Sequence, residues 1–122
     1  MPLRSFLFAP GNHPRRVEKA LTLDADAVIL DLEDAVALAE KPATRDAVVA
    51  AYAQPRTGQL YVRVNAADTE FCHGDFNAIV RAGLDGIILP KVETAATLQT
   101  IDWLPTHLER ERGLVPGTID LV

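Results

Sequence analysis

The sequence lacks disulfide-forming cysteine pairs, zinc-type motifs and long apolar runs. It contains one cysteine, Cys72, so an internal disulfide is excluded, and its three histidines are scattered without zinc-type spacing. No run of 18 apolar residues occurs, and the apolar stretch near the N-terminus is too short for a signal peptide. We therefore expect a reduced, cytoplasmic setting, without secretion or a membrane span.

Basic residues are also in the minority. The chain has 12 Lys and Arg against 17 Asp and Glu, which gives a net charge of −5. This balance argues against a broad surface for nucleic acid or an anionic membrane, so any anionic ligand must be bound by a local group of basic residues. With 48% hydrophobic and 24% charged residues in 122, the chain has enough apolar material for one core, and we expect one domain.

Short apolar segments alternate strictly with amphipathic ones. Strands are predicted near 5–9, 27–32, 60–65, 86–90 and 118–122. Helices are predicted from about Pro14 and over 43–53, 76–82 and 94–101, with Pro105 separating the last from another helical piece at 106–112. This alternation is typical of βαβ units and predicts an α/β fold with parallel strands and right-handed crossovers.

Either an open doubly wound sheet or a (β/α)8 barrel fits this alternation, and the pattern within the strands favours the barrel. Asp31 and Glu33 share one face of their strand, and Arg63 shares a face with Asn65. Polar residues confined to one face suit the mouth of a barrel lumen better than a sheet covered by helices on both sides. We therefore expect helices on one side only, and the apolar lumen positions are predicted to include Phe8, Ile29 and Leu89.

An acidic cluster, Asp31, Glu33 and Asp34, follows the apolar run 27–30. It lies where the strand should end, which is where parallel α/β sheets carry their chemistry. Close carboxylates need a cation, a shared proton or hydrogen-bond donors, so we expect Arg63 within salt-bridge reach of the cluster. Lys91 ends the fourth strand and joins the candidate site. The alternatives are a solvated turn, an Arg63 that only stabilises the core, and a Lys91 that extends to solvent.

Four segments, at 4–15, 25–36, 62–65 and 85–93, together resemble the citrate lyase beta subunit and malyl-CoA lyase group of the HpcH/HpaI aldolase superfamily. The resemblance implies that the chain is the N-terminal part of a (β/α)8 TIM barrel, with about five parallel strands. Members are usually more than twice as long. Residues 1–122 would then be a partial TIM-barrel lyase domain, with the remainder expected after residue 122.

The resemblance also implies a reaction. It is that of a Mg2+-dependent carbon–carbon lyase, which cleaves a 3-hydroxyacyl thioester such as citryl-CoA or malyl-CoA by retro-Claisen or retro-aldol chemistry. The thioester would be carried by CoA or by an acyl-carrier protein. Members are commonly trimers or hexamers, so a homo-oligomer is implied for the complete protein.

Site residues follow from the resemblance position by position. Arg63 matches the catalytic arginine that neutralises the developing oxyanion, and Glu33 and Asp34 match acids that hold the water shell of the magnesium. Arg15 and Lys19 match positions that contact CoA. Asn65 and Lys91 are placed with the substrate-binding residues. The direct metal ligands, a Glu and an Asp, are expected after Val122, so none is expected in this chain.

Two further interpretations stay open at this point. The first is a half-barrel without catalysis, which binds CoA-like phosphates through Arg15 and Lys19 or assembles with a partner. The second is an open-sheet phosphate-binding domain whose likeness to the family is superficial.

Overall fold

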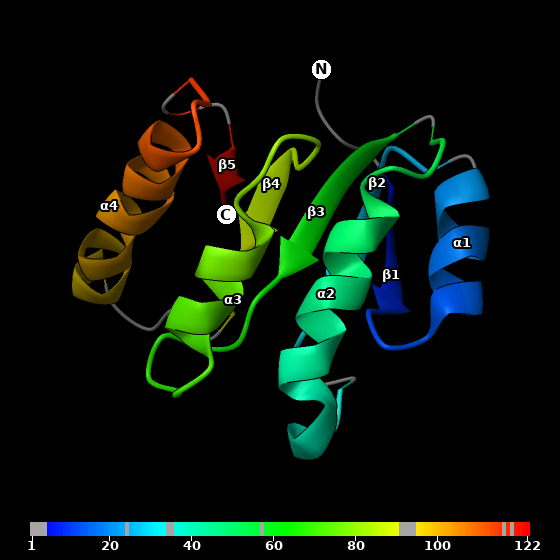
Figure 1. The fold of residues 1–122 in the computed structure, drawn as a ribbon, viewed down its shortest axis with the longest axis horizontal. Coiled ribbons are helices and arrows are strands. Elements are labelled where there is room, and N and C mark those ends of the chain that lie inside the picture. The colour runs from blue at the N-terminus through cyan, green and yellow to red at the C-terminus, as the bar shows by residue number, and fades with distance from the viewer. Residues whose placement is uncertain are drawn as a thin grey trace.

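The computed structural model describes residues 5–23, 25–33, 36–56, 58–90, 95–115, 117 and 119–122. Strands and helices alternate along the chain (Figure 1). The strands are β1 (Phe6–Pro10), β2 (Ala27–Asp31), β3 (Gln59–Arg63), β4 (Gly86–Ile88) and β5 (Asp120–Leu121). The helices are α1 (Pro14–Thr22), the 3-10 turn η1 (Leu38–Glu40), α2 (Lys41–Ala51), α3 (Cys72–Ile79) and α4 (Ala95–Glu111).

The strands form one parallel sheet in the order β1-β2-β3-β4-β5. Each strand therefore pairs with the next one in sequence, as the alternation predicted. The register aligns the carboxyl ends, with Pro10 opposite Asp31 and Asp31 opposite Arg63. Both predicted polar strand ends thus lie at the same edge of the sheet.

The main core lies between the sheet and its helices. All residues of β2 are buried. On α1 the buried residues are Val17, Ala20 and Leu21, the i, i+3, i+4 spacing of a single helix face. Helix side chains such as Val48 and Phe76, both fully buried, pack with the strand residues of the same cluster. The apolar periodicity of the sequence therefore faces each helix toward the sheet.

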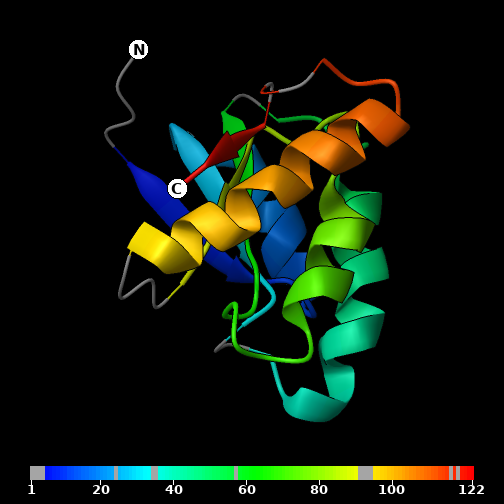
Figure 2. The same cartoon turned by 90° about the vertical axis from the view of Figure 1, so that its left-hand side faces the viewer.

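On the other face of the sheet, the apolar cluster is formed by strand residues alone. Its small apolar cluster consists of Ala27, Ile29 and Tyr61, with Ile88 packed against it. Figure 2 shows the sheet on one side and α1, α2 and α3 on the other, and α4 joins the same helix-side core through Leu104 and Leu108. No helix in the described ranges packs on the cluster of the opposite face. The prediction of helices on one side only is confirmed, and with it the barrel arrangement over the open sheet with helices on both faces.

The predicted lumen position of Leu89 is wrong. It belongs to the cluster on the helix side, together with Ile87, whereas Ile88 lies on the other face. Side chains alternate along a strand, so Leu89 follows Ile87 rather than the lumen positions. The prediction was right for the face of Ile29 and wrong for Leu89.

The predicted break at Pro105 is also wrong. Pro105 lies inside a continuous helix, Ala95–Glu111, rather than between two pieces. An internal proline removes one backbone hydrogen bond and strains the preceding turn, at a cost of about 3 kcal/mol. Leu104 and Leu108 are both buried in the core on either side of it. This burial on one helix face holds the helix together across the proline.

The other helix boundaries differ by a few residues. α2 begins at Lys41 instead of 43, and α3 begins at Cys72 instead of 76. None of the described helices combines the length and apolar character that a membrane crossing requires.

Candidate functional site

A bidentate ion pair joins the carboxyl ends of β2 and β3. Asp31 is the last residue of β2 and Arg63 the last of β3, and the register places them side by side. Arg63 donates from Nε to Asp31 Oδ1 at 2.9 Å and from Nη2 to Oδ2 at 2.8 Å. Asp31 is 2% exposed. Two parallel bonds fix the plane of the guanidinium as well as its position.

Glu33 lies next to the ion pair of Asp31 and Arg63. Its Oε1 is 3.8 Å from Arg63 Nε, and the residue is 5% exposed. The Glu33 backbone amide donates to Asp31 Oδ1 at 2.9 Å, so Asp31 orients both residues. The prediction that Arg63 lies within salt-bridge reach of the acidic cluster is confirmed for Asp31 and Glu33.

The strand β1 contributes an aromatic ring. The Arg63 guanidinium carbon lies 5.0 Å from the centroid of the Phe8 ring, a cation–π distance. Phe8 is 52% exposed, which agrees with its predicted position on the face without helices.

Gly11, just after β1, holds the first turn close to the backbone at the end of β2. Its amide donates to the Asp31 carbonyl at 2.9 Å. A Cβ at Gly11 would come within 2.9 Å of that carbonyl and within 2.7 Å of Val48 Cγ2, so only glycine allows this approach. Three strands therefore meet at the site.

Asn65 departs from the face of Arg63. β3 ends at Arg63, and the Asn65 side chain bonds toward the helices, accepting from Lys41 Nζ at 2.7 Å and donating to Asp75 Oδ2 at 2.7 Å. The shared face was a wrong prediction, because strict alternation stops with the strand. The role of Asn65 in substrate binding stays a prediction. Lys41 and Asp75 were not among the residues singled out in the sequence.

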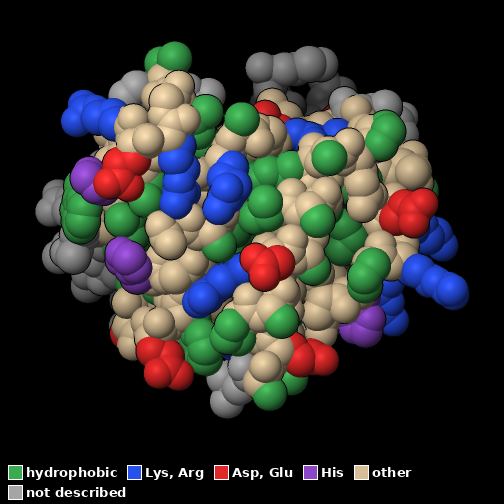
Figure 3. Space-filling model, viewed as in Figure 1, with side chains coloured by type: hydrophobic (Ala, Val, Ile, Leu, Met, Phe, Trp, Pro, Cys, Tyr) green, Lys and Arg blue, Asp and Glu red, His purple; other side chains and the backbone are tan. Residues whose placement is uncertain are grey.

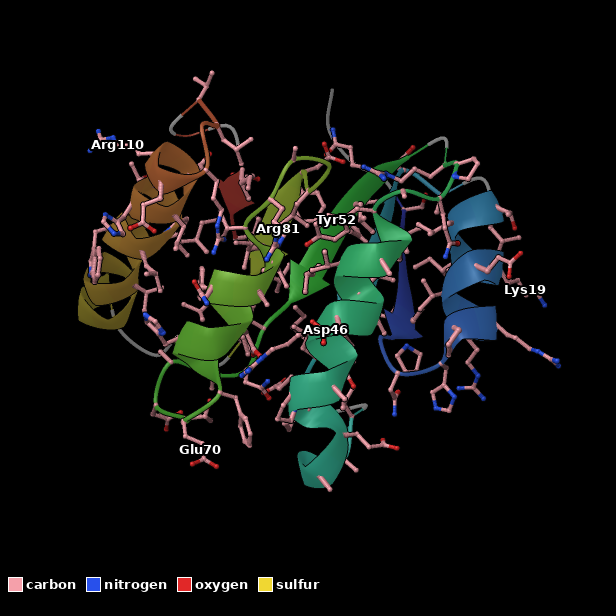
Figure 4. The ribbon with its side chains drawn as sticks, in the orientation of Figure 1. Lys19, Asp46, Tyr52, Glu70, Arg81 and Arg110 are labelled. Atoms are coloured by element: carbon pink, nitrogen blue, oxygen red, sulfur yellow. The ribbon has the colours of Figure 1, made fainter. Side chains whose placement is uncertain are left out.

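Arg15 and Lys19 are exposed on α1. Arg15 lines an open cavity of about 470 Å³ with His13 and Arg16, and Lys19 lines another of about 200 Å³ with Arg16 and Phe8. Basic side chains gather over α1 at the right-hand edge of Figure 3, and Figure 4 shows Lys19 pointing away from the sheet there. Arg16, which borders both cavities, was overlooked as a candidate in the sequence.

Two of the predicted site residues, Asp34 and Lys91, lie outside the described residues. Their assignment to the site stays a prediction.

Within the described ranges, no group of three or more His, Cys, Asp or Glu side chains is arranged to hold a metal ion. The carboxylates that are near one another, Asp31 and Glu33, are within reach of Arg63. Carboxylate oxygens are suitable partners for the waters that Mg2+ retains in protein sites. The donor chemistry of Glu33 therefore fits a contact to magnesium through water, but the described residues do not form a direct metal centre.

Cys72 is buried and poorly suited to act as a nucleophile. Burial, reinforced by the nearby Asp75 carboxylate, raises the pKa of its thiol to about 11. At neutral pH the side chain is a thiol, whereas the reactive form is the thiolate. Covalent catalysis by this cysteine is therefore disfavoured.

Comparison with known proteins identifies relatives of the whole described region. The profile of the HpcH/HpaI aldolase/citrate lyase family matches residues 4–122. The chain is 44% identical over 121 residues to the citrate lyase subunit beta of Leuconostoc mesenteroides subsp. cremoris, covering 98% of this chain and 40% of that protein. It is 43% identical over 102 residues to a (3S)-malyl-CoA thioesterase of Cereibacter sphaeroides, covering 82% of this chain and 36% of that protein.

Solved structures give the same result. A citrate lyase beta subunit from M. tuberculosis, complexed with oxaloacetate and magnesium, is 40% identical with a TM-score of 0.67, covering 79% of this chain and 42% of that one. CitE from the same organism, complexed with the triphosphate group of ATP, is 36% identical with a TM-score of 0.68, covering 81% and 44%. The chain thus spans at most about 44% of these proteins. The chain belongs to the HpcH/HpaI aldolase/citrate lyase family.

Proposed function

We propose that this chain is the N-terminal part of a Mg2+-dependent carbon–carbon lyase that cleaves a 3-hydroxyacyl thioester of the citryl-CoA or malyl-CoA kind. Residues 1–122 would form part of a barrel that continues after residue 122. The observation that carries the proposal is the Arg63 guanidinium, held by Asp31 at the carboxyl ends of β2 and β3 with Glu33 beside it.

Arg63 suits the charge that develops in such a cleavage. The 3-hydroxyl loses its proton, the C2–C3 bond breaks, and C3 becomes the carbonyl of a 2-oxo acid. The electron pair passes to the thioester as an enolate, which takes up a proton to give the shorter acyl thioester. A guanidinium that is always charged and fixed in its plane stabilises the enolate oxygen without having to reorient during the reaction.

Glu33 and Asp34 are proposed to hold waters of the magnesium, and the direct ligands are expected beyond this chain. When bound, the metal supplies a Lewis acid for the carboxylate and carbonyl of the 2-oxo acid. The complex of a relative with oxaloacetate and magnesium supports the choice of metal. Asn65 and Lys91 stay in the proposal as groups near the substrate.

Cleavage assays on the complete protein test the proposal. We expect citryl-CoA or malyl-CoA to give a 2-oxo acid and a shorter acyl-CoA, with activity lost on chelation of Mg2+ and restored by its return.

Arg63→Lys keeps the charge but loses the planar fork, so kcat should fall about 100-fold or more while KM changes little. Arg56→Lys is a matched control, because Arg56 is similarly buried but binds the carbonyls of Tyr52 and Gly83. An unchanged kcat in Arg63→Lys would remove Arg63 from the mechanism.

Phosphate recognition is proposed for α1. Arg15 and Lys19, with Arg16 between them, would hold the phosphates of CoA, and the triphosphate complex of a relative supports an anion site in the family. In the complete protein, Arg15→Glu with Lys19→Glu should weaken CoA binding about tenfold or more, measured by calorimetric titration. Arg110→Glu, on the outer side of α4, is the control (Figure 4). Unaltered affinity would mean that α1 simply presents a solvated face.

Thioester hydrolysis is a second candidate, favoured by the identity to a (3S)-malyl-CoA thioesterase. The two reactions differ in their first product. A lyase retains the thioester and releases a 2-oxo acid, whereas a thioesterase releases free CoA thiol and an intact hydroxy acid. Thiol and carbonyl assays on one reaction mixture therefore distinguish them.

A half-barrel without catalysis, binding CoA or a partner, is the alternative from a different functional class. It predicts CoA binding by the complete protein with neither product formed.

We also propose that the complete protein is a homo-oligomer, either a trimer or a hexamer. Light scattering measures its molar mass directly.

A further inference from the structure

A buried polar network lies behind the site, between the sheet ends and the helices. It consists of Lys41, Arg45, Asn65 and Asp75. Lys41, Asn65 and Asp75 are 6%, 2% and 0% exposed. Charged groups are rarely this buried unless they are fully bonded, so their contacts identify what the network holds in place.

Lys41 holds the segment that carries the acidic cluster. As the first residue of α2, it donates from Nζ to the Leu32 carbonyl at 3.1 Å and to the Glu33 carbonyl at 2.7 Å. The Glu33 amide is bound by Asp31 Oδ1. The backbone of Glu33 is therefore fixed on both sides, by Asp31 and by Lys41.

The same ammonium reaches the end of β3. Its third bond, at 2.7 Å, goes to Asn65 Oδ1, and Asn65 Nδ2 donates to the Leu32 carbonyl at 3.0 Å. Asn65 follows Arg63 by two residues. Lys41 and Asn65 thus join the segments after β2 and β3, which carry Glu33 and Arg63.

Asp75 anchors the network to α3. Its Oδ2 accepts from the Asn65 amide at 2.8 Å and from Asn65 Nδ2 at 2.7 Å, and its Oδ1 accepts from Arg45 Nε at 2.8 Å. Arg45 also donates to the Phe71 carbonyl at 3.1 Å. A Cβ at Gly74 would lie 2.7 Å from Arg45 Nη2, so the glycine makes room for the guanidinium. Two helices therefore support one short stretch of backbone at the site.

We propose that Lys41 is a positioning residue, which sets Glu33 relative to Arg63 through the carbonyls of Leu32 and Glu33 and through Asn65. The inference rests on the proposed lyase function for its kinetic consequence only. Its geometric consequence, the placement of Glu33 and Arg63, can be measured without activity. Small displacements of catalytic groups lower turnover strongly while leaving substrate affinity nearly intact.

The test is Lys41→Met in the complete protein, which removes the donors and the charge while keeping most of the side-chain length. We expect kcat to fall about tenfold or more with KM changed less than about threefold. The 15N–1H signal of Arg63 Nε, assigned by its loss in Arg63→Lys, should shift or lose protection from exchange. Arg110→Met removes one positive charge from α4 at the outside of the molecule and should change neither readout (Figure 4).

The outcomes are separable. If Lys41→Met is folded, with the amide protection of α2 and α3 retained, but the Arg63 signal and kcat are unchanged, the proposal is wrong. If the wild-type protein cleaves no thioester, the lyase function fails, and the Arg63 signal still decides the positioning role. Should Lys41→Met not fold, Asn65→Leu separates Lys41 from Asp75 and keeps both charges. The same displacement of the Arg63 signal is expected there, and its absence would overturn the proposal.

Discussion

At the scale of single residues, the site depends on a carboxylate that organises its neighbours. Asp31 accepts two bonds from Arg63 and one from the Glu33 amide. A buried group that satisfies three donors cannot be removed without leaving them unpaired, and each unpaired donor costs more than the net value of the bond it made. Asp31 therefore has a structural role that precedes any chemistry.

Asp31→Ala in the complete protein tests this role through stability. We expect the free energy of unfolding to fall by about 2–4 kcal/mol, because Arg63 and the Glu33 amide lose a buried acceptor. Urea unfolding followed by circular dichroism measures it. Asp46→Ala, an exposed carboxylate on α2, should change stability by less than about 0.5 kcal/mol (Figure 4). Equal losses in the two variants would contradict the assignment.

Cys72 gives a prediction for the alkaline range. The pKa of its thiol is raised to about 11 in the folded protein, above the ordinary value of 9.0. Between these values the unfolded chain has lost the proton and the folded chain has kept it, so stability should decrease as pH rises from 9 to 11. Cys72→Ala should flatten this part of the curve of unfolding free energy against pH. A wild-type curve that is no steeper than that of the variant would count against the raised pKa.

Part of the site could be predicted from the sequence because parallel strands bring their carboxyl ends together. Asp31, Glu33 and Arg63 follow from strand ends and alternation alone. Lys41 and Asp75 do not, because a charged residue on a helix is usually solvated and nothing in its spacing indicates burial. Asn65 was placed on the wrong face because the end of a strand is set by tertiary contacts.

At the scale of elements, the order and type of the strands and helices followed from hydrophobic periodicity, whereas their ends did not. Helix α4 is the instructive case. Pro105 is a local stop signal, yet Leu104 and Leu108 pack into the same core and the helix continues. Local preference was overridden by burial that no short window of sequence contains.

Pro105→Ala should therefore stabilise the protein. The alanine restores an amide hydrogen inside α4 and removes the clash of the ring, although a more flexible unfolded chain offsets part of the gain. We expect an increase of about 1 kcal/mol in the free energy of unfolding, measured by thermal and urea denaturation. Pro42→Ala, in the first turn of α2 where proline is tolerated, should not stabilise. A destabilised Pro105→Ala would show that the packing of the proline ring stabilises the protein more than its strain on the helix destabilises it.

At the scale of the whole molecule, the uncovered face of the sheet has a consequence for the isolated chain. Phe6 and Phe8 are 50% and 52% exposed, and β1 and β5 are the outer strands. Exposed apolar side chains beside unpaired strand edges promote association. We expect the 122-residue polypeptide alone to self-associate or to be poorly stable, and to lack lyase activity.

Sedimentation at several concentrations checks this expectation. Phe6→Ser with Phe8→Ser should reduce the association if the uncovered face is responsible, because both side chains belong to the strand at one edge. A monomeric 13.3 kDa species with a cooperative thermal transition and Mg2+-dependent cleavage would contradict the expectation in full.

The sequential strand order also has a bearing on how the sheet is made during translation. Each strand pairs with the strand synthesised just before it, and the helix between them packs on the same side. Contacts of this kind close shorter loops than pairing with a more distant strand would, so each new strand can dock without waiting for later segments. The pair Asp31 and Arg63 can therefore form as soon as β3 has emerged from the ribosome, before β4 has emerged.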